Sequence, residues 1–300
     1  MYAKPTAPRS IGGVLDDAIK LYREAFAKSW LLALIGQVLI AGPLLVIRLK
    51  MTAIPEAGGN PMAAAMNPAA AAALMAVFKS PAIWLSYLLA IIFTFGLYNA
   101  LIAQADAFAK GRQQSIGESF AVGFRLLPCS ALLYLVMTAA FTIGAVCVGL
   151  VAGLLGAMHV SAIVGAILGL ALLVFGIYAW GRAFLANTAL VVETTGVFKS
   201  LGISWTLIKN HWWRTATVYG VAIIIAIVFY FLVAGLDGVI FAVLRGSGAS
   251  ATIVSQLLSI ATGAVLTPFY PTVLLAMYYD LKLRNEGADL AGRVNALAPQ

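Results

Sequence analysis

Charged residues are scarce in this 300-residue chain. Only 10% of the residues are charged and 62% are hydrophobic, whereas a soluble domain carries about 25% charged residues on its surface. Cysteine and histidine occur only twice each, so no Cys/His spacing of a metal site is present. Cys129 and Cys147 fall on one predicted helix and lie too far apart to bridge. These shortages exclude a water-soluble domain and a disulfide framework.

Catalytic patterns are missing as well. The chain contains no HExxH, no GxSxG and no paired carboxylates at a catalytic spacing. A nucleophile must be activated by a base or a metal, and His211, beside Trp212 and Trp213, fits an amphipathic helix better than a general base. We therefore predict a non-enzymatic protein that holds no cofactor and no metal.

Long apolar runs make up most of the chain. Six runs of about 18 to 25 residues occur, which is the length at which a helix crosses ~30 Å of hydrocarbon. They lie near residues 30–47, 82–104, 129–151, 160–180, 215–236 and 253–277. None of them alternates with the period of two that marks membrane strands. The sequence predicts an all-α membrane protein, in which residues 1–300 form one integral domain with six transmembrane helices.

The basic residues are distributed unevenly between the connections. If the N-terminus is cytoplasmic, 15 of the 19 lysines and arginines fall in inside segments, as the positive-inside rule requires. The other four are Arg48, Lys50, Lys79 and Arg245. The net charge of +8 thus predicts two cytoplasmic termini and an attraction to membrane lipids. It does not predict nucleic-acid binding, because no basic face with interleaved aromatics appears outside the membrane-edge segments.

Three segments with a similar beginning each precede a pair of apolar runs. Ser10-Ile-Gly12, Ser115-Ile-Gly117 and Ser200-Leu-Gly202 start stretches with helical spacing of apolar residues. Such amphipathic helices lie in the membrane interface. The simplest organisation is three units, each an interfacial helix followed by a helical hairpin, at about 10–105, 115–180 and 200–278.

An alanine-rich loop at 51–80 interrupts this symmetry. Pro55, Pro61 and Pro68 divide the loop, and the alanine-rich run from Ala69 to Phe78 is predicted to form a helix. In the predicted topology this loop is periplasmic.

A few polar residues and two prolines fall inside the apolar runs. Gln37, Asn99 and Gln256 either join helices by hydrogen bonds or line a path for a solute. Pro268 and Pro271 predict an interruption of the sixth helix. Such an interruption is either structural or the mark of a substrate site in a transporter.

The closing segment Tyr278-Tyr-Asp-Leu-Lys-Leu-Arg-Asn-Glu-Gly-Ala-Asp-Leu290 resembles a bacterial membrane-protein family. This family contains the membrane domain of glycerophosphoryl diester phosphodiesterases and its stand-alone relatives. The segments Glu193–Gly196, Ser204–Trp205 and Trp212–Arg214 agree with it, as does the opening from Ser10 to Arg23, whereas Lys282 and Ile203 depart from its pattern. The resemblance implies a six-helix domain of the bacterial inner membrane with no assigned role. It implies no phosphodiesterase activity, because the catalytic barrel of those enzymes is a separate domain.

Charged residues gather near the predicted cytoplasmic ends of the helices. We expect Arg182, Glu193, Asp280 and Arg284 to form a cluster that contacts a partner or a lipid headgroup. The leading hypothesis is a protein that binds lipid or a membrane partner protein. The alternative is a transporter or channel subunit for a small solute, based on the intramembrane amides and the two prolines.

Overall fold

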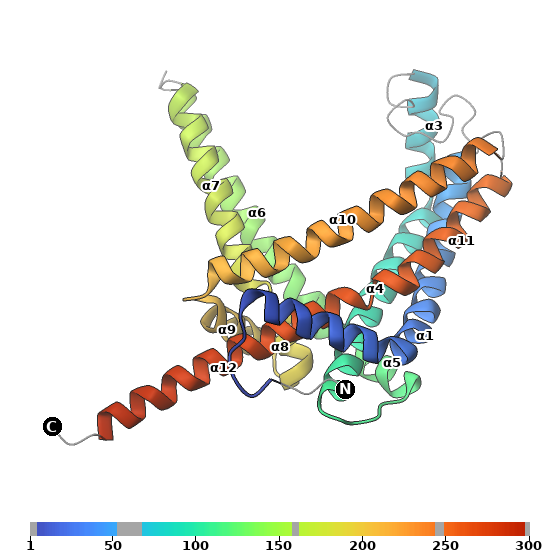
Figure 1. The fold of residues 1–300 in the computed structure, drawn as a ribbon. Coiled ribbons are helices and arrows are strands. Elements are labelled where there is room, and N and C mark those ends of the chain that lie inside the picture. Colours follow the sequence, from blue (N-terminus) through green and yellow to red (C-terminus); the bar gives the residue numbers. More distant parts are fainter. Residues whose placement is uncertain (1–4, 53–67, 158–161, 244–248, 298–300) are drawn as a thin grey trace.

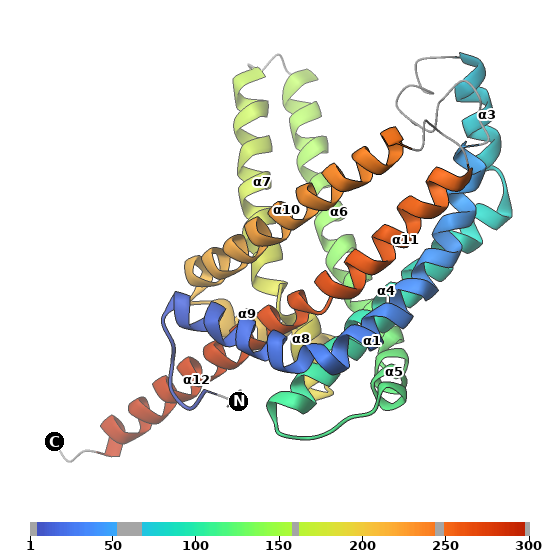
Figure 2. The ribbon, with the colours of Figure 1, turned by 45° about the vertical axis from the view of Figure 1, so that its right-hand side comes forward.

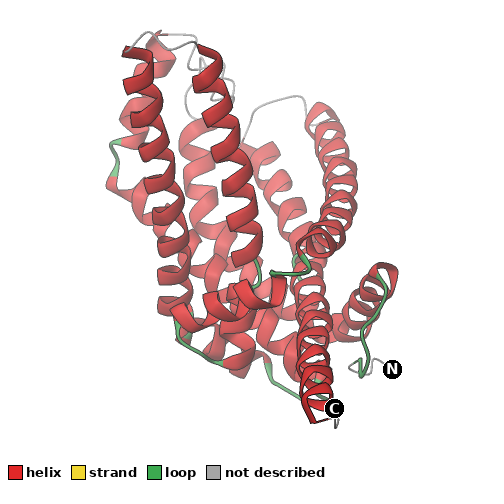
Figure 3. Cartoon of the chain, turned by 90° about the vertical axis from the view of Figure 1, so that its left-hand side faces the viewer, coloured by secondary structure: helices red, strands yellow, loops and turns green. Residues whose placement is uncertain are grey.

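All regular structure in the described part of the chain is helical. The computed structural model describes residues 5–52, 68–157, 162–243 and 249–297 (Figures 1 and 3). The helices are α1 (Ile11–Thr52), α3 (Pro68–Phe78), α4 (Pro81–Ala109), α5 (Ile116–Arg125), α6 (Leu127–Ala157), α7 (Ala162–Ala183), α8 (Ala186–Glu193), α9 (Val197–Ile208), α10 (Trp212–Val243), α11 (Ala249–Leu266) and α12 (Phe269–Leu297).

Six segments are long and apolar enough to cross a membrane. They are Ile11–Ile47, Pro81–Ala109, Leu127–Val151, Ile163–Glu193, Trp212–Leu236 and Ile253–Gly287. Each of them contains or overlaps one of the six runs predicted from the sequence. The prediction of an all-α membrane protein with six apolar spans is therefore confirmed.

The first span is longer than predicted. The interfacial segment that begins at Ile11 and the run that begins at residue 30 form one helix, α1, of 42 residues. At 1.5 Å per residue this helix is ~63 Å long, about twice the hydrocarbon thickness. Figures 1 and 2 show that α1 changes direction along its length. The Ser29 hydroxyl donates to the Ala25 carbonyl at 3.0 Å, a back-bond that often bends helices.

The sixth span is interrupted where the prolines predict. Helix α11 ends at Leu266 and α12 begins at Phe269. Pro268 has no N–H with which to continue the helix. Pro271 falls in the first turn of α12, where a missing N–H costs little because no helical partner exists there.

Three of the shorter predicted helices are present as α3, α5 and α9, and one helix was not predicted. Helix α3 covers the alanine-rich run of the 51–80 loop, while residues 53–67 lie outside the described part. Helix α5 begins at the capping box of Ser115 and Glu118: each backbone N–H binds the other residue's side chain, at 2.8 and 3.2 Å. The unpredicted helix is α8, whose residues 186–191 are all buried.

Burial is concentrated in three of the six spans. In the most apolar stretch of each span, 28% of the α1 residues are buried, 44% of the α4 residues and 50% of the α11–α12 residues, against 6%, 6% and 11% in the spans of α6, α7 and α10. The α6–α7 hairpin projects away from the rest (Figures 1 and 2). The members of each hairpin contact one another, α1 with α4, α6 with α7 and α10 with α11. This pairing fits the three predicted units, whose repetition remains a prediction.

Candidate functional site

The first half of α12 forms a polar junction with four other parts of the chain. We use this name for Asp106, Glu193, Arg214, Tyr278, Tyr279, Asp280, Lys282 and Arg284. Tyr278 is 0% and Tyr279 2% exposed, so the ring bodies belong to the core. Their hydroxyls nevertheless reach carboxylates on α8 and α4. One short stretch of α12 therefore connects α4, α8, α10 and the N-terminal segment.

Asp280 ties the N-terminal segment to α10 and α12. Its carboxylate accepts hydrogen bonds from Arg214 Nε at 2.9 Å, from Arg284 Nε at 3.0 Å and from the Arg9 backbone N–H at 2.8 Å. Both guanidinium groups also donate to the Arg9 carbonyl. The Asp280 side chain is only 3% exposed, and a buried carboxylate is stable only when it is paired in this way.

The other two carboxylates of the junction are paired in a similar way. Glu193, at the end of α8, accepts from the Tyr278 hydroxyl and the Lys282 ammonium. Asp106, near the end of α4, accepts from the Tyr279 hydroxyl and from Lys110. The three acidic groups lie on three different helices, so these pairs fix α4 and α8 against α12.

Arg182 lies apart from the predicted charged cluster. Its guanidinium group donates to the Tyr178 hydroxyl at 2.9 Å and to the Trp205 carbonyl at 2.7 Å, and it stacks 4.1 Å from the Trp205 ring centre. The side chain binds α9 close to its carboxyl end, where a helix dipole favours a cation. Of the four predicted residues, the structure thus brings together Asp280 and Arg284 directly. It places Glu193, at the end of α8, against Tyr278 and Lys282 on the same stretch of α12, and it separates Arg182.

A closed ring of three buried hydrogen bonds joins α4, α6 and α8. The Asn99 amide donates to Ser130 Oγ at 2.8 Å, Ser130 donates to Asn187 Oδ1 at 2.9 Å, and the Asn187 amide donates to Asn99 Oδ1 at 3.1 Å. Each of these residues is at most 6% exposed. The geometry assigns Asn99 to helix joining, one of its two predicted roles.

The remaining predicted polar residues lie on α1 and α11. Gln37 donates to Thr267 Oγ1 at 2.8 Å, directly at the break between α11 and α12. Gln256 is 7% exposed, and its Oε1 has no partner among the described residues. The break is also braced by Tyr22, whose hydroxyl donates to the Val265 carbonyl at 2.7 Å. Gln37, Pro268 and Pro271 therefore share one location.

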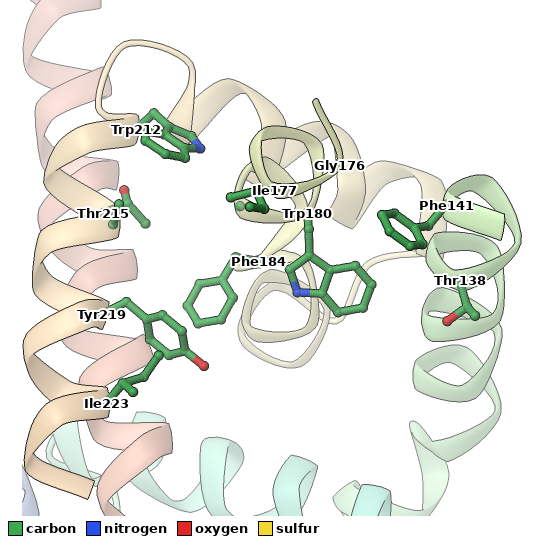
Figure 4. Close-up of a pocket in the computed structure, with 13 residues that line it drawn as sticks. Thr138, Phe141, Gly176, Ile177, Trp180, Phe184, Trp212, Thr215, Tyr219 and Ile223 are labelled. Carbon is green, nitrogen blue, oxygen red and sulfur yellow. The ribbon is translucent and has the colours of Figure 1, made fainter. Parts of the chain in front are cut away.

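Two apolar hollows flank the end of α7. The first, the α7–α10 hollow, has a volume of about 650 Å³ and is formed by residues of α6, α7 and α10 together with Phe184. Figure 4 shows Phe184 beside Tyr219, Trp180 beyond Phe184, and Trp212 and Thr215 nearer the start of α10. The second, of about 580 Å³, lies between α6, α7 and α9. Both fall in the size range of ligand sites.

A tight contact between α7 and α10 shapes one wall of the first hollow. A Cβ atom on Gly181 would lie 2.8 Å from Trp212 Nε1, so only glycine permits this approach of the indole. The Phe184 and Tyr219 rings pack with their centres 4.1 Å apart. The hollow is therefore bounded by rigid aromatic side chains.

His211 lies in the turn between α9 and α10. Its pKa is held below the ordinary value first by burial and then by the nearby positive charges of Arg284 and Arg214, which outweigh Asp280. Among the described residues, no group of three His, Cys, Asp or Glu side chains is arranged to hold a metal ion.

Several residues of these sites were not predicted from the sequence. Asp106 and its partner Tyr279 are 173 positions apart, and no local pattern connects them. Ser130 and Asn187 complete the ring with Asn99, but a single Ser and a single Asn that are 57 positions apart give no signal of pairing. Arg214 was recognised as a basic residue at the membrane edge and not as the partner of Asp280.

Comparisons with known proteins identify no relative: no family profile, no curated protein and no solved structure matches the chain. The similarity of the closing segment to the bacterial membrane-domain family therefore remains a prediction.

Proposed function

We propose that this chain is a non-enzymatic, multi-pass protein of the bacterial inner membrane that binds membrane lipid in the α7–α10 hollow. The observation that carries the proposal is the hollow itself, about 650 Å³ in volume and lined by Phe141, Ile177, Trp180 and Ile223 among others. Such a surface accepts an acyl chain without burying an unpaired polar group. Indole and phenol groups at its edge suit the interface between hydrocarbon and headgroups.

The distribution of charge supports cytoplasmic termini. Arg9, Arg214 and Arg284 meet at Asp280, so the N-terminal segment, the start of α10 and α12 lie on one side. Lys50 donates to Ser80 at the opposite end of the α1–α4 pair. The side with more basic residues is the one that the positive-inside rule assigns to the cytoplasm.

Two glycines of α10 allow a direct test of lipid binding. A Cβ atom on Gly220, which lines the hollow, would meet nothing within 4 Å, and neither would one on Gly235 farther along the same helix. Gly220→Phe therefore fills the hollow, and Gly235→Phe adds the same ring outside it.

Native mass spectrometry of the protein purified in a gentle detergent measures the retained phospholipid. We expect Gly220→Phe to retain at most a fifth of the wild-type amount and Gly235→Phe to retain all of it. Equal retention by the two variants contradicts a lipid site in this hollow. Stoichiometric capture of one protein by wild type in place of lipid favours the partner-protein version of the hypothesis.

A second candidate is transport of a small solute, favoured by the break between α11 and α12. Broken helices line substrate sites in many transporters, and Gln37 binds Thr267 at this break. Solute flux into proteoliposomes that is lost in Gln256→Leu or Pro268→Ala supports transport. Flux that these substitutions leave unchanged contradicts it.

A further inference from the structure

A third hollow lies beside the break in the sixth span. Its volume is about 580 Å³, and its walls come from α1, α4, α10 and the residues on both sides of the break. Six polar side chains line it: Gln37, Thr94, Tyr98, Tyr230, Thr267 and Tyr270. Thr94 is at the middle of α4, so the hollow belongs to the spanning part of the molecule. Unlike the two hollows beside α7, it is rich in hydroxyl groups.

The broken helix lacks two backbone hydrogen bonds beside this wall. Pro271 has no N–H, so the Thr267 carbonyl receives no helical hydrogen bond from it. In the same way, Pro268 gives no bond to the carbonyl of Ala264, and Tyr22 caps the carbonyl of Val265. Irregular backbone at membrane depth occurs where it is buried in protein or lines a cavity.

The Gln37 amide is held at the break by a close approach to α11. Its Nε2 donates to Thr267 Oγ1 at 2.8 Å. A Cβ atom on Gly263 would lie 2.6 Å from the Gln37 Cδ atom, so a larger residue at position 263 would collide with the Gln37 side chain. The amide thus packs directly against the backbone of α11. The amide is therefore positioned by α11 as well as by its hydrogen bond.

The lining determines which ligand chemistry fits. None of the lining side chains is charged, so a charged ligand would enter an apolar environment without a counter-charge, which is costly. Hydroxyl groups both donate and accept, as the hydroxyls of a polyol do. Gln37 and Thr94 each make one hydrogen bond within the protein, but a purely apolar ligand would leave the remaining hydrogen-bonding capacity of the lining unused. Aromatic rings on three sides suit the apolar faces of a sugar ring.

We propose that this hollow binds a neutral, polyhydroxylated molecule, either a free polyol or sugar or the sugar headgroup of a lipid. The inference concerns binding at the helix break. It does not depend on the lipid site proposed in the α7–α10 hollow.

Three probes test the ligand class with the full chain in nanodiscs of phosphatidylethanolamine and phosphatidylglycerol. Glycerol represents the free polyol, monoglucosyl diacylglycerol the lipid-borne sugar, and glycerol 3-phosphate the charged counterpart. Saturation-transfer NMR measures the soluble probes, and native mass spectrometry measures the glycolipid. We expect one of the neutral probes to bind, with glycerol 3-phosphate at least tenfold weaker than that probe. Which neutral probe binds identifies the source. Binding of neither, or equal binding of the charged probe, overturns the proposal.

Matched threonine variants place the binding at the break. Thr267→Val removes a hydroxyl from this hollow, and Thr138→Val removes one from the lining of the α7–α10 hollow. We expect at least a tenfold loss of affinity for the neutral probe in Thr267→Val and none in Thr138→Val or Gly220→Phe.

A second variant covers the case in which Thr267→Val fails to fold. Thr94→Val alters the same hollow, and the Thr94 hydroxyl donates to Ala90 in its own helix at 2.7 Å. A weaker but clear loss of affinity is expected. Wild-type affinity in a folded variant at either position overturns the assignment.

Discussion

The polar junction and the α6–α7 hairpin show two different ways in which an apolar chain is organised. In the junction, Tyr278, Tyr279 and Asp280 are at most 2% exposed and every carboxylate has a partner. In the hairpin, Leu154 is 67%, Ile163 69% and Leu170 62% exposed. In water such a hairpin would be unstable, but hydrocarbon is as apolar as leucine, so exposure there costs little.

This difference shows where the arrangement of the helices is specified. Apolar faces in a bilayer have little preference for protein over lipid, so packing and hydrogen bonds must select the neighbours of each helix. The junction supplies ion pairs that join α8 and α10 to α12, and a tyrosine hydrogen bond that joins α4 to α12. The α6–α7 hairpin joins the rest mainly through its lower end, by Ser130 and Arg182. We therefore expect substitutions in the two regions to have very different effects.

The largest difference is expected between two leucine substitutions. Leu190 is 0% exposed on α8 and Leu170 is 62% exposed on α7. Leu190→Ala leaves a cavity and should lower the free energy of unfolding by about 3 kcal/mol, within the range for buried leucines. Leu170→Ala removes only contacts with lipid and should change it by less than about 0.5 kcal/mol.

Unfolding of both variants by sodium dodecyl sulfate in mixed micelles, followed by tryptophan fluorescence, measures the two effects. Because both substitutions exchange leucine for alanine within a helix, helix propensity changes equally. Similar losses in the two variants would refute the contrast between the regions.

The second effect tests the charges of the junction. Asp280→Asn leaves Arg214 and Arg284 without a carboxylate in a position where they are 18% and 25% exposed. Loss of one partner from a buried pair lowers the free energy of unfolding by about 3 to 5 kcal/mol. Because the arginines are partly exposed, we expect Asp280→Asn to lower it by about 2 kcal/mol. Asp16→Asn, at an exposed position of α1, is the matched control and should be neutral. An equal effect of both substitutions in the same unfolding assay would show that Asp280 adds only surface charge.

The outline of the spans was predictable because apolar length is a local property. The interruption at Pro268 was predictable for the same reason, since the missing N–H acts on its own helix. The continuity of α1 was not predicted, because the amphipathic segment and the apolar run were interpreted as two elements. Residues 27–30 contain no proline or glycine that would separate them. Helix α8 was missed because its eight residues mix polar and apolar types without a clear period.

The site was predictable only in part because its partners are distant in sequence. Glu193 and Asp280 were expected to meet basic groups, and both do. The sequence did not reveal that Arg182 would bind the Trp205 carbonyl and ring in place of a carboxylate. The sequence shows that charged residues gather at one end of the helices, whereas tertiary packing decides which of them pair.

The third effect concerns the hydrogen-bonded ring of Asn99, Ser130 and Asn187, which joins the poorly buried α6 to the better buried part. Asn99→Leu leaves Ser130 and Asn187 each without one partner. Each hydrogen bond between membrane helices contributes about 0.6 to 2 kcal/mol to stability, so we expect Asn99→Leu to lower the free energy of unfolding by about 1 kcal/mol. A double-mutant cycle with Asn187→Leu isolates the coupling, which should be about 0.5 to 1 kcal/mol. Strictly additive losses would mean that the ring does not act as a unit.

The smallest effect is expected from pH. Because the His211 pKa lies below its ordinary value of 6.5 in the folded protein, the unfolded chain binds a proton more readily. Stability is then unaffected above that value and decreases as the pH falls below it.

Thermal unfolding at pH 7.5 and 5.5 should show a small decrease in melting temperature at the lower pH, reduced in His211→Gln. All other titratable residues are the same in the two proteins, so the difference between them reports His211. Glu118, whose pKa is also lowered, loses its contribution only as the pH falls below about 4.5, outside this interval. An unchanged pH dependence in His211→Gln would show that neither burial nor the cations of the junction lower the pKa of this histidine in the folded protein.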